Sequence, residues 1–263
     1  MYCRLIFSQM LTKFYKVSFI ILTLIHTLYS QSDTIYFFKN GEIIYNTPVS
    51  EIDSILFHQP SNGLSGTFTD SRDGRVYSTI TIGTQTWMSE NLAYLPQINP
   101  PTIRSSTVPY YYVYNYTGTN LNEALSSVYY SKYGVLYNYP AALTACPSGW
   151  HLPDTTEFAI LINYLGGHDT GGGKAKTTGY TYWDPANPGA TNESGFSGRG
   201  SGFYYPATYI FRNERMFGYY WSQNYNIGTT PYIYILEFNT PRFVKTYFVR
   251  NYGFSIRCVK NDP

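Results

Sequence analysis

Charged residues are scarce in this chain. Asp, Glu, Lys and Arg make up 13% of the 263 residues, against roughly 25% in an average soluble domain. Three of the 18 basic residues fall in an N-terminal leader that holds no acidic residue, which leaves 15 bases against 16 acids. The mature chain therefore has a net charge of −1, without the basic excess that a nucleic-acid partner would require.

Cysteine is scarcer still, with one residue at each of positions 3, 146 and 258. Cys3 lies in the leader, so two cysteines remain in the mature chain. An even count in an oxidising compartment permits one disulfide, between Cys146 and Cys258. No spacing of Cys and His matches a zinc site, so no metal is predicted.

Patterns for phosphate and calcium binding are absent as well. Three glycines precede Lys174, but His168 stands where a phosphate loop needs its first glycine, and Ala175 stands where it needs Ser or Thr. Asp70 and Asp73 lack the spacing of an EF-hand loop and are expected to form a turn. No cofactor is predicted, and calcium finds no support in the sequence.

A secretory signal peptide is predicted over residues 1–30. Two lysines precede an apolar run at residues 17–28, and a small serine then meets a polar glutamine. The run is too short to span a bilayer, and no cysteine follows it for lipid attachment. Met10 is an alternative to Met1 as the start codon. We expect an exported protein, extracellular or on the cell surface, with the periplasm as the alternative.

The mature chain is predicted to begin with a small β-hairpin module, residues 31–58. An Asn-Gly pair tolerates the positive φ of a tight turn and has strand-like residues on both sides. The apolar positions of residues 49–57 could alternatively form an added edge strand. A Ser- and Gly-rich linker, residues 59–69, then leads to a larger domain, residues 70–263.

The larger domain is predicted to open with a hairpin over residues 73–92. An Asp-Gly turn comes first, and Ile80 and Ile82 then follow at a period of two. Residues 96–130 lack clean periodicity, which indicates a long loop.

Two helices are predicted next. The first is alanine-rich, covers residues 140–146 and carries a proline at its tolerated first position. The second begins after Asp154, which forms a capping box with Glu157, and ends at Gly166. Its apolar residues recur on one face: Phe158, Leu161, Ile162 and Leu165.

The remainder is predicted to be a loop and then a sheet. Repeated Gly and Pro breaks indicate a loop over residues 167–216. Alternating or apolar runs indicate strands at residues 232–238, 243–249 and 254–259. Strands, two helices, a loop and further strands together predict an α+β fold.

Three segments of the chain resemble the Fibrobacter succinogenes major paralogous domain, a module of exported bacterial proteins. They read Ile-Gly-x-Gln-x-Trp-Met-x-Glu-Asn-Leu at residues 82–92, Cys-Pro-Ser-Gly-Trp-His-Leu-Pro at 146–153 and Gly-Phe-Ser-Ile-Arg-Cys-Val at 253–259. The resemblance implies a C-type-lectin-like domain, in which the first and last strands pair, two helices flank the sheet and a long loop carries the function.

The resemblance also implies roles for single residues. It places Cys146 and Cys258 in a disulfide between the end of the first helix and the last strand, and makes His151 a structural hydrogen-bonding residue. It includes a structural Gly-Lys-x-Lys segment, matched by residues 173–176. The tryptophans within its motifs are expected to pack in the core: Trp87, Trp150 and Trp221.

The long loop, about residues 176–216, and the aromatic residues beside it form the predicted contact surface. Aromatic rings are rigid and offer large contact area at little cost in side-chain entropy. The candidate ligand-binding residues are Trp183, Asn192, Glu193, Tyr204, Tyr205, Tyr219 and Tyr220.

We therefore expect a non-catalytic recognition or adhesion module that binds a glycan or a surface protein. A hydrolase or modifying enzyme is the alternative, because the expected fold is similar to that of sulfatase-activating enzymes. That alternative requires a free thiol at Cys146 beside His151, or a pair of carboxylates. The carboxylates available are Asp169, Asp184, Glu193 and Glu214. A structural component of a surface assembly is a third hypothesis.

Overall fold

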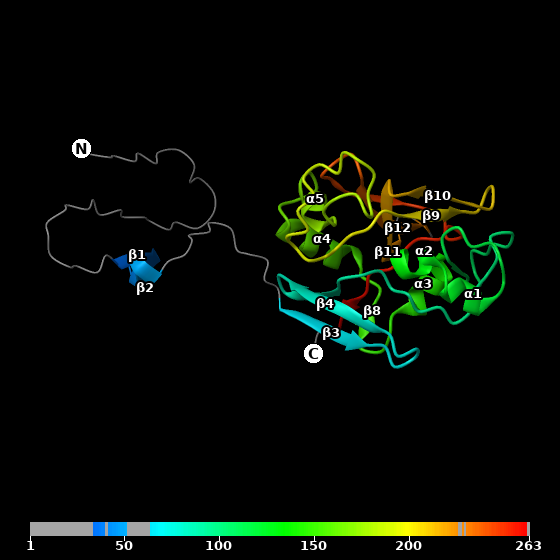
Figure 1. The fold of residues 1–263 in the computed structure, drawn as a ribbon, viewed down its shortest axis with the longest axis horizontal. Helices are drawn as coiled ribbons and strands as arrows, with labels where there is room; N and C mark the ends of the chain where they lie inside the picture. Colours follow the sequence, from blue (N-terminus) through cyan, green and yellow to red (C-terminus); the bar gives the residue numbers. More distant parts are fainter. Residues whose placement is uncertain (1–33, 40–41, 52–63, 226–227, 229, 262–263) are drawn as a thin grey trace, which may run out of the picture. The chain divides into compact units, whose positions relative to one another are not determined.

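The computed structural model describes residues 34–39, 42–51, 64–225, 228 and 230–261. The chain divides into two compact units, Met1–Gln59 and Pro60–Pro263 (Figure 1). The predicted signal peptide lies outside the described residues. Within the described ranges, no helix is both long and apolar enough to cross a membrane.

The small unit contains the predicted hairpin. Strands β1 (Thr34–Lys39) and β2 (Glu42–Pro48) pair antiparallel, and the register shifts between Phe37 and Phe38. The alternative edge strand at residues 49–57 is not formed at its start, because Val49–Glu51 is a 3-10 helix (η1). Residues 52–57 lie outside the described part of the chain.

The first sheet of the large unit has the strand order β3-β4-β5-β14-β8. Its strands are β3 (Ser65–Thr69), β4 (Val76–Ile82), β5 (Gln85–Met88), β8 (Trp150–His151) and β14 (Val259–Lys260). The antiparallel pairing of β4 with β5 confirms the hairpin predicted over residues 73–92. The terminal strand lies in the middle of this sheet, because Val259 pairs with both β5 and β8.

Strand β3 corrects the prediction that residues 59–69 are a linker. Five residues of that segment pair in register with β4, from Ser65 opposite Ile80 to Thr69 opposite Val76. The ring of Phe68 lies 5.2 Å from that of Trp150, between centroids. The Ser- and Gly-rich composition hid this strand, which contributes a single large apolar side chain to the core.

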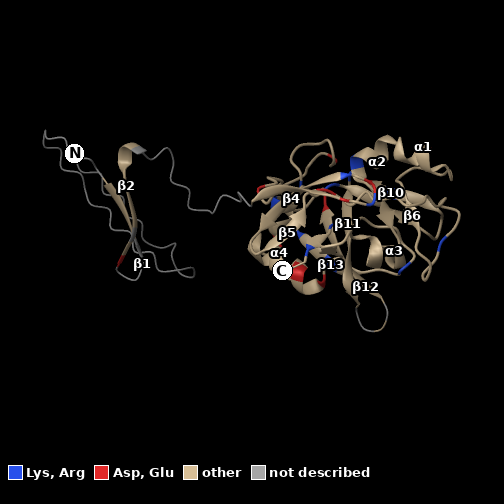
Figure 2. Cartoon of the chain, turned by 90° about the horizontal axis from the view of Figure 1, so that it is seen from below, with Lys and Arg blue, Asp and Glu red and all other residues tan. Residues whose placement is uncertain are grey.

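The second sheet has the strand order β10-β9-β11-β12-β13. Its strands are β9 (Ser201–Tyr205), β10 (Ile210–Glu214), β11 (Phe217–Tyr225), β12 (Pro231–Glu237) and β13 (Phe243–Tyr247). A further short pair consists of β6 (Tyr111–Tyr112) and β7 (Leu136–Tyr137). Charged side chains are thinly distributed over both sheets (Figure 2).

Strands β9 and β10 show that the loop predicted over residues 167–216 was too long. A short helix, α5 (Gly171–Ala175), lies in the same segment. Strand β9 joins the sheet through a parallel bridge between Gly202 and Gly218, in which Gly202 has a φ of 62°. A Cβ at Gly202 would collide with the carbonyl oxygen of Arg212 and with the Tyr114 ring, so glycine is required there.

The two predicted helices are present as α3 (Tyr139–Ala145) and α4 (Thr155–Tyr164). The capping box of α4 forms as predicted: Asp154 accepts from the N–H of Glu157 at 2.8 Å, and the Glu157 carboxylate accepts from the N–H of Asp154 at 2.8 Å. The segment 96–130, predicted to be a loop, also contains α1 (Leu121–Leu125) and the start of α2 (Val128–Tyr133).

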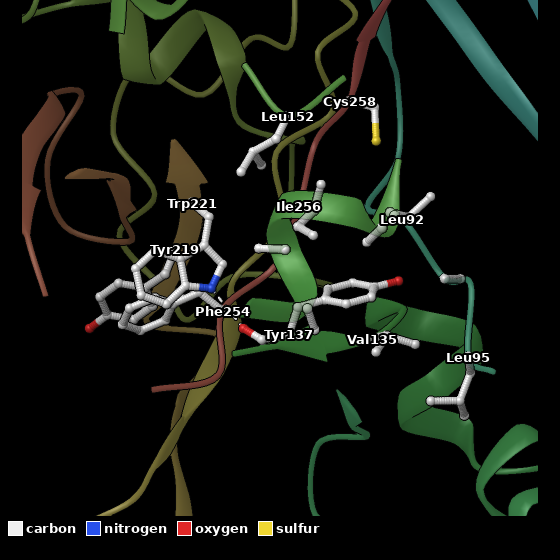
Figure 3. Close-up of a cluster of buried hydrophobic side chains, with 14 of the residues drawn as sticks. Leu92, Leu95, Val135, Tyr137, Leu152, Tyr219, Trp221, Phe254, Ile256 and Cys258 are labelled. Atoms are coloured by element: carbon white, nitrogen blue, oxygen red, sulfur yellow. Dashed lines mark hydrogen bonds between the residues drawn. The ribbon is translucent and has the colours of Figure 1, made fainter. Parts of the chain in front are cut away.

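The second sheet separates two buried clusters of side chains. Residues alternate along its strands, so Trp221 and Ile233 point into one cluster while Tyr220 and Tyr234 point into the other. In the first cluster, shown in Figure 3, the indole N–H of Trp221 donates to a main-chain carbonyl of β7 at 2.7 Å. The second cluster is covered by α4, whose Phe158 ring stacks on Tyr234 at 4.0 Å.

Residues 253–260 connect the two sheets. Gly253 bridges to β9, Ser255 bridges to β11, and Val259 pairs in the first sheet. This segment was predicted to be a strand over residues 254–259. It is extended, but only Val259–Lys260 forms a continuous strand, because the earlier residues exchange single bridges with different partners.

Arg257 lies fully buried within this connecting segment. Its Nη2 donates to Asn91 Oδ1 at 2.8 Å, and its Nη1 donates to the carbonyl oxygens of Met88, at 3.2 Å, and of Phe196. The guanidinium carbon also lies 4.3 Å from the Phe196 ring centroid. Burial lowers the pKa of Arg257 to about 10.

The disulfide between Cys146 and Cys258 is present, as predicted, with Cα atoms 5.9 Å apart. It joins the residue that follows α3 to the connecting segment, one residue after Arg257. The two cysteines are 112 residues apart in the sequence, so the bridge closes most of the large unit into one covalent loop.

Replacing both cysteines by alanine is expected to lower the free energy of unfolding by roughly 4–5 kcal/mol, because a bridge of this span restricts the unfolded chain. Urea denaturation of the oxidised protein and of the double variant measures the difference. Wild-type protein kept in reductant is the control and should unfold with the variant. Coincident transitions of the oxidised protein and the variant would contradict this expectation.

Candidate functional site

The tryptophans and the histidine of the sequence motifs are structural. Trp87 and Trp221 are fully buried and Trp150 is nearly so, which confirms their predicted packing role. His151 Nε2 lies 2.7 Å from Glu157 Oε1, and its Nδ1 lies 2.6 Å from Asn261 Oδ1. These contacts tie strand β8 to the start of α4 and to the C-terminal residues.

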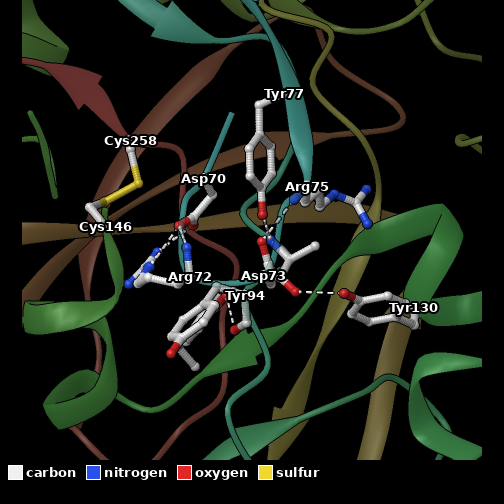
Figure 4. Close-up of polar contacts among 11 residues, drawn as sticks. Asp70, Arg72, Asp73, Arg75, Tyr77, Tyr94, Tyr130, Cys146 and Cys258 are labelled. Carbon is white, nitrogen blue, oxygen red and sulfur yellow. Dashed lines mark hydrogen bonds and ion pairs between the residues drawn. A yellow bond between two sulfur atoms is a disulfide. The ribbon is translucent and has the colours of Figure 1, made fainter. Parts of the chain in front are cut away.

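A polar cluster stabilises the turn between β3 and β4 (Figure 4). Arg72 donates from two nitrogens to the buried carboxylate of Asp70, at 2.9 and 2.6 Å, and its guanidinium lies 3.7 Å from the Tyr94 ring centroid. Burial acts to raise the pKa of Asp70, but hydrogen bonds and charge from Arg72 outweigh it and hold the pKa below its ordinary value.

The same cluster confirms that Asp70 and Asp73 are turn-forming residues. Asp73 Oδ1 accepts from the main-chain N–H of Arg75 at 3.0 Å, and the N–H of Gly74 donates to the carbonyl of Asp70 at 2.8 Å. Across the described ranges, no group of three Asp, Glu, His or Cys side chains could hold a metal ion.

Four of the predicted ligand-binding rings are buried in the core, which corrects that prediction. Trp183, Tyr204 and Tyr220 have no exposed surface, and Tyr219 is 6% exposed. The indole of Trp183 donates inward to the Thr177 hydroxyl at 3.0 Å. A ligand cannot stack on the first three rings in this conformation.

The two polar candidates are engaged within their own loop. Asn192 Oδ1 accepts from the main-chain N–H of Ser197 at 2.8 Å, and its Nδ2 lies 3.0 Å from the Ser197 hydroxyl. Glu193 forms an ion pair with Lys174 at 3.0 Å. The structure thus uses Asn192 to brace the loop, and it links Glu193 to helix α5 rather than to the tyrosines of β9 and β11.

Strand alternation explains where the tyrosine pairs lie. Along β9, Tyr204 points toward β6 and stacks on Tyr112 at 4.1 Å, whereas Tyr205 points to the opposite face and remains partly exposed. Along β11, Tyr220 enters the core under α4, and Tyr219 shares the face of Tyr205. One member of each predicted pair is therefore near the surface.

Tyr205 and Tyr219 belong to a continuous set of rings that we call the aromatic face. Tyr252 lies at its centre, with ring centroids 5.6 Å from Tyr205, 5.0 Å from Phe248 and 5.9 Å from Phe203. Its partly exposed members surround the nearly buried rings of the second sheet. The aromatic face consists of Phe203, Tyr205, Phe217, Tyr219, Val244, Phe248 and Tyr252.

Polar groups lie at the margins of the aromatic face. The exposed Arg212 has its guanidinium carbon 4.8 Å from the Tyr205 ring centroid, and Asn213 Nδ2 donates to the Tyr219 hydroxyl at 3.1 Å. Glu237 is opposite Phe217 in the sheet register. Burial and the Glu237 charge raise the pKa of Tyr219 to about 12, despite the hydrogen bond from Asn213, so this phenol keeps its proton at neutral pH.

A family model provides the comparison that identifies this chain. The model of the Fibrobacter succinogenes major domain matches residues 80–260, which include all three motif segments. The chain belongs to this family. No curated protein and no solved structure matches the chain. The mixed helices and sheets of this Fibrobacter succinogenes major domain confirm the predicted α+β class.

The sequence missed the arginine and five residues of the aromatic face: Phe203, Phe217, Val244, Phe248 and Tyr252. Phe217, Phe248 and Tyr252 follow the predicted loop, and Arg212 lies inside it. The alternation of large residues from Phe217 to Trp221 was the available signal for a strand. No local signal indicates that residues 248–252 fold back over that strand.

The Gly-Lys-x-Lys segment of this Fibrobacter succinogenes major domain contains a buried lysine. Lys176 Nζ donates to the carbonyl oxygens of Glu237 and Thr240, each at 2.9 Å, and lies 5.5 Å from the Trp183 ring centroid. It therefore fastens the start of the long loop to the turn between β12 and β13. Burial lowers the pKa of Lys176 to about 8, and the charge of Glu237 offsets this only in part.

This lowered pKa predicts a pH effect on stability. Between about pH 8 and the ordinary lysine value of 10.5, the unfolded chain keeps a proton that folded Lys176 has released, so the contribution of Lys176 to the free energy of unfolding rises with pH. The free energy of unfolding of the wild type minus that of Lys176→Met, from urea denaturation at pH 7.5, 8.5 and 9.5, should increase with pH. Lys174→Met, at an exposed ion pair, is the control. Parallel profiles for wild type and Lys176→Met would refute the effect.

Proposed function

We propose that this protein is an exported, non-catalytic recognition module that binds a glycan or a surface protein through its aromatic face. The observation that carries the proposal is the row of partly exposed rings on strands β9 and β11, at Phe248 after β13 and on the turn at Tyr252. Large rings held at a surface, with polar groups at the margin, are the composition of many protein contact sites.

The aromatic face is supported on a rigid base. Strands β9 and β11 are paired on both edges, and the Phe254 ring packs beneath the face, 5.1 Å from Tyr219 and 5.7 Å from Tyr252. Rings fixed in this way lose little conformational entropy when a ligand binds. The long loop contributes β9 and Arg212 to the site, while β11, β13 and the turn at Tyr252 lie beyond it.

The disulfide supports the export that the leader sequence predicts, because such bonds persist in oxidising compartments. The extracellular space or the cell surface is the proposed location, and the periplasm is the alternative. Pairing of the terminal β14 with β5, together with the flanking helices α3 and α4, supports a C-type-lectin-like domain as the proposed finer fold class.

The side chains that an enzyme would need are engaged elsewhere. The sulfur of Cys146 is bonded to Cys258, so it offers no thiolate to His151. Each of the four carboxylates considered for acid–base chemistry forms an ion pair with a basic side chain. These pairs are Asp169 with Arg242, Asp184 with Arg215, Glu193 with Lys174 and Glu214 with Lys132.

Alanine substitutions in the aromatic face test the proposal. Tyr205→Ala and Tyr252→Ala should each weaken binding by about tenfold, the loss typical of a large ring at the centre of a contact. Binding is measured on a glycan array and by pull-down from envelope extracts, with thermal melts to show that the variants are folded.

Tyr247→Ala is the matched control, because Tyr247 lies on β13, is 54% exposed and points away from the aromatic face. It should leave binding unchanged. Equal losses at Tyr247 and Tyr205, or retained binding in both face variants, would count against the aromatic face as the contact surface.

A further inference from the structure

Arg212 is an exposed basic residue on strand β10 of the large unit. Six Lys and Arg side chains of the described chain form ion pairs with carboxylates, and Arg212 is not among them. Instead it is exposed and covers the ring of Tyr205. A guanidinium that lies on a ring keeps its N–H donors at its edge, where they can bind a carboxylate with two parallel hydrogen bonds.

The aromatic face beside Arg212 suits a sugar ring. The rings of Phe203 and Tyr252 are within 12° of parallel, and the Tyr205 ring is tilted by 58° from that of Tyr252. A pyranose has an apolar C–H face and hydroxyls at its edge, so it can pack on such rings while its hydroxyls reach phenols. The partly exposed Tyr205 and Tyr252 supply those phenols.

An extended peptide fits this surface less well. Strands β9 and β11, which carry Phe203, Tyr205, Phe217 and Tyr219, are already paired on both edges. A peptide lying on their side chains could not add main-chain hydrogen bonds to them, and these bonds supply much of the affinity when a strand is added to a sheet.

The charges around the face limit the charge of the ligand. Arg212 lies on edge strand β10, and Glu237 lies opposite Phe217 at the end of β12, on the other side of the rings. One cation beside one anion favours a ligand that presents a carboxylate to Arg212 and neutral hydroxyls to Glu237.

We propose that the aromatic face binds a glycan that contains uronic acid, with a sugar ring against Tyr205 and Tyr252 and its carboxylate on Arg212. This inference rests on the proposed recognition function and names its ligand class. The rings of Tyr205 and Tyr252 contact the sugar, and the guanidinium, which has no carboxylate partner in the described chain, distinguishes an acidic sugar from a neutral one.

Polygalacturonate and its fully methyl-esterified form provide a matched pair of probes, because esterification removes the charge and keeps the sugar. Affinity electrophoresis and calorimetry on the full-length mature protein should show about tenfold weaker binding to the ester, as expected for loss of a charged hydrogen bond. Alginate, a second uronate polymer, should bind, and neutral xylan should bind as weakly as the ester.

Arg212→Gln should reduce binding to polygalacturonate by a similar factor and leave binding to the ester unchanged. Arg242→Gln is the control, since Arg242 is an exposed arginine in the turn before β13 and lies outside the aromatic face. Raising NaCl from 50 to 500 mM should weaken binding of the wild type and have little effect on Arg212→Gln.

Equal binding of acidic and esterified polymer, or equal effects of the two arginine variants, would overturn the uronate inference. If no polysaccharide binds, but Tyr205→Ala still weakens capture of an envelope protein, the inference fails and the recognition function stands. If neither polysaccharide nor envelope component depends on Tyr205 or Tyr252, both proposals fail.

Discussion

The buried guanidinium of Arg257 is the constraint on which the arrangement of the large unit depends. A charged group without water is costly unless its donors find acceptors, and here Nη1 and Nη2 bind oxygens of Met88, Asn91 and Phe196, while the buried Nε has no partner. Met88 ends β5, Asn91 lies just beyond it, and Phe196 belongs to the long loop. These acceptors belong to two distant segments, so Arg257 fixes both around residues 253–260, and its pKa of about 10 keeps the charge at neutral pH.

The aromatic face follows from the same segment. Apolar and polar residues alternate along this segment. The side chains of Phe254, Ile256 and Cys258 pack in the first buried cluster. Between them, Ser255 hydrogen-bonds to Ser201, and Arg257 donates to Asn91. The Phe254 ring then packs against the rings of the face. An aromatic face supported directly by the core can remain ordered with few charges.

Local signals explain what the sequence predicted well. The capping box of Asp154 and the hairpin at residues 73–92 depend on residues a few positions apart, and both are present. Strands β9 and β10 could not be predicted this way, because β9 pairs with β11 through glycines 16 positions apart and its neighbours look like a loop. Because that strand was not predicted, the alternation that buries Tyr204 and partly exposes Tyr205 could not be predicted either. The burial of Arg257 is equally hidden, since its partners lie 60 or more positions away.

The abundance of tyrosine has a structural cause that also limits the contact surface. Buried tyrosines bind main-chain carbonyls of irregular segments: Tyr137 reaches Tyr94 at 2.8 Å, Tyr112 reaches Ile103 at 3.1 Å and Tyr204 reaches Pro101 at 2.6 Å. Each such ring fills core volume while its hydroxyl satisfies a carbonyl that no helix or strand can pair. Long connections are thereby fastened without ion pairs, which fits a chain with 30 tyrosines and 13% charged residues. Ten tyrosines of the described chain are buried, so residue type alone does not distinguish those of the aromatic face.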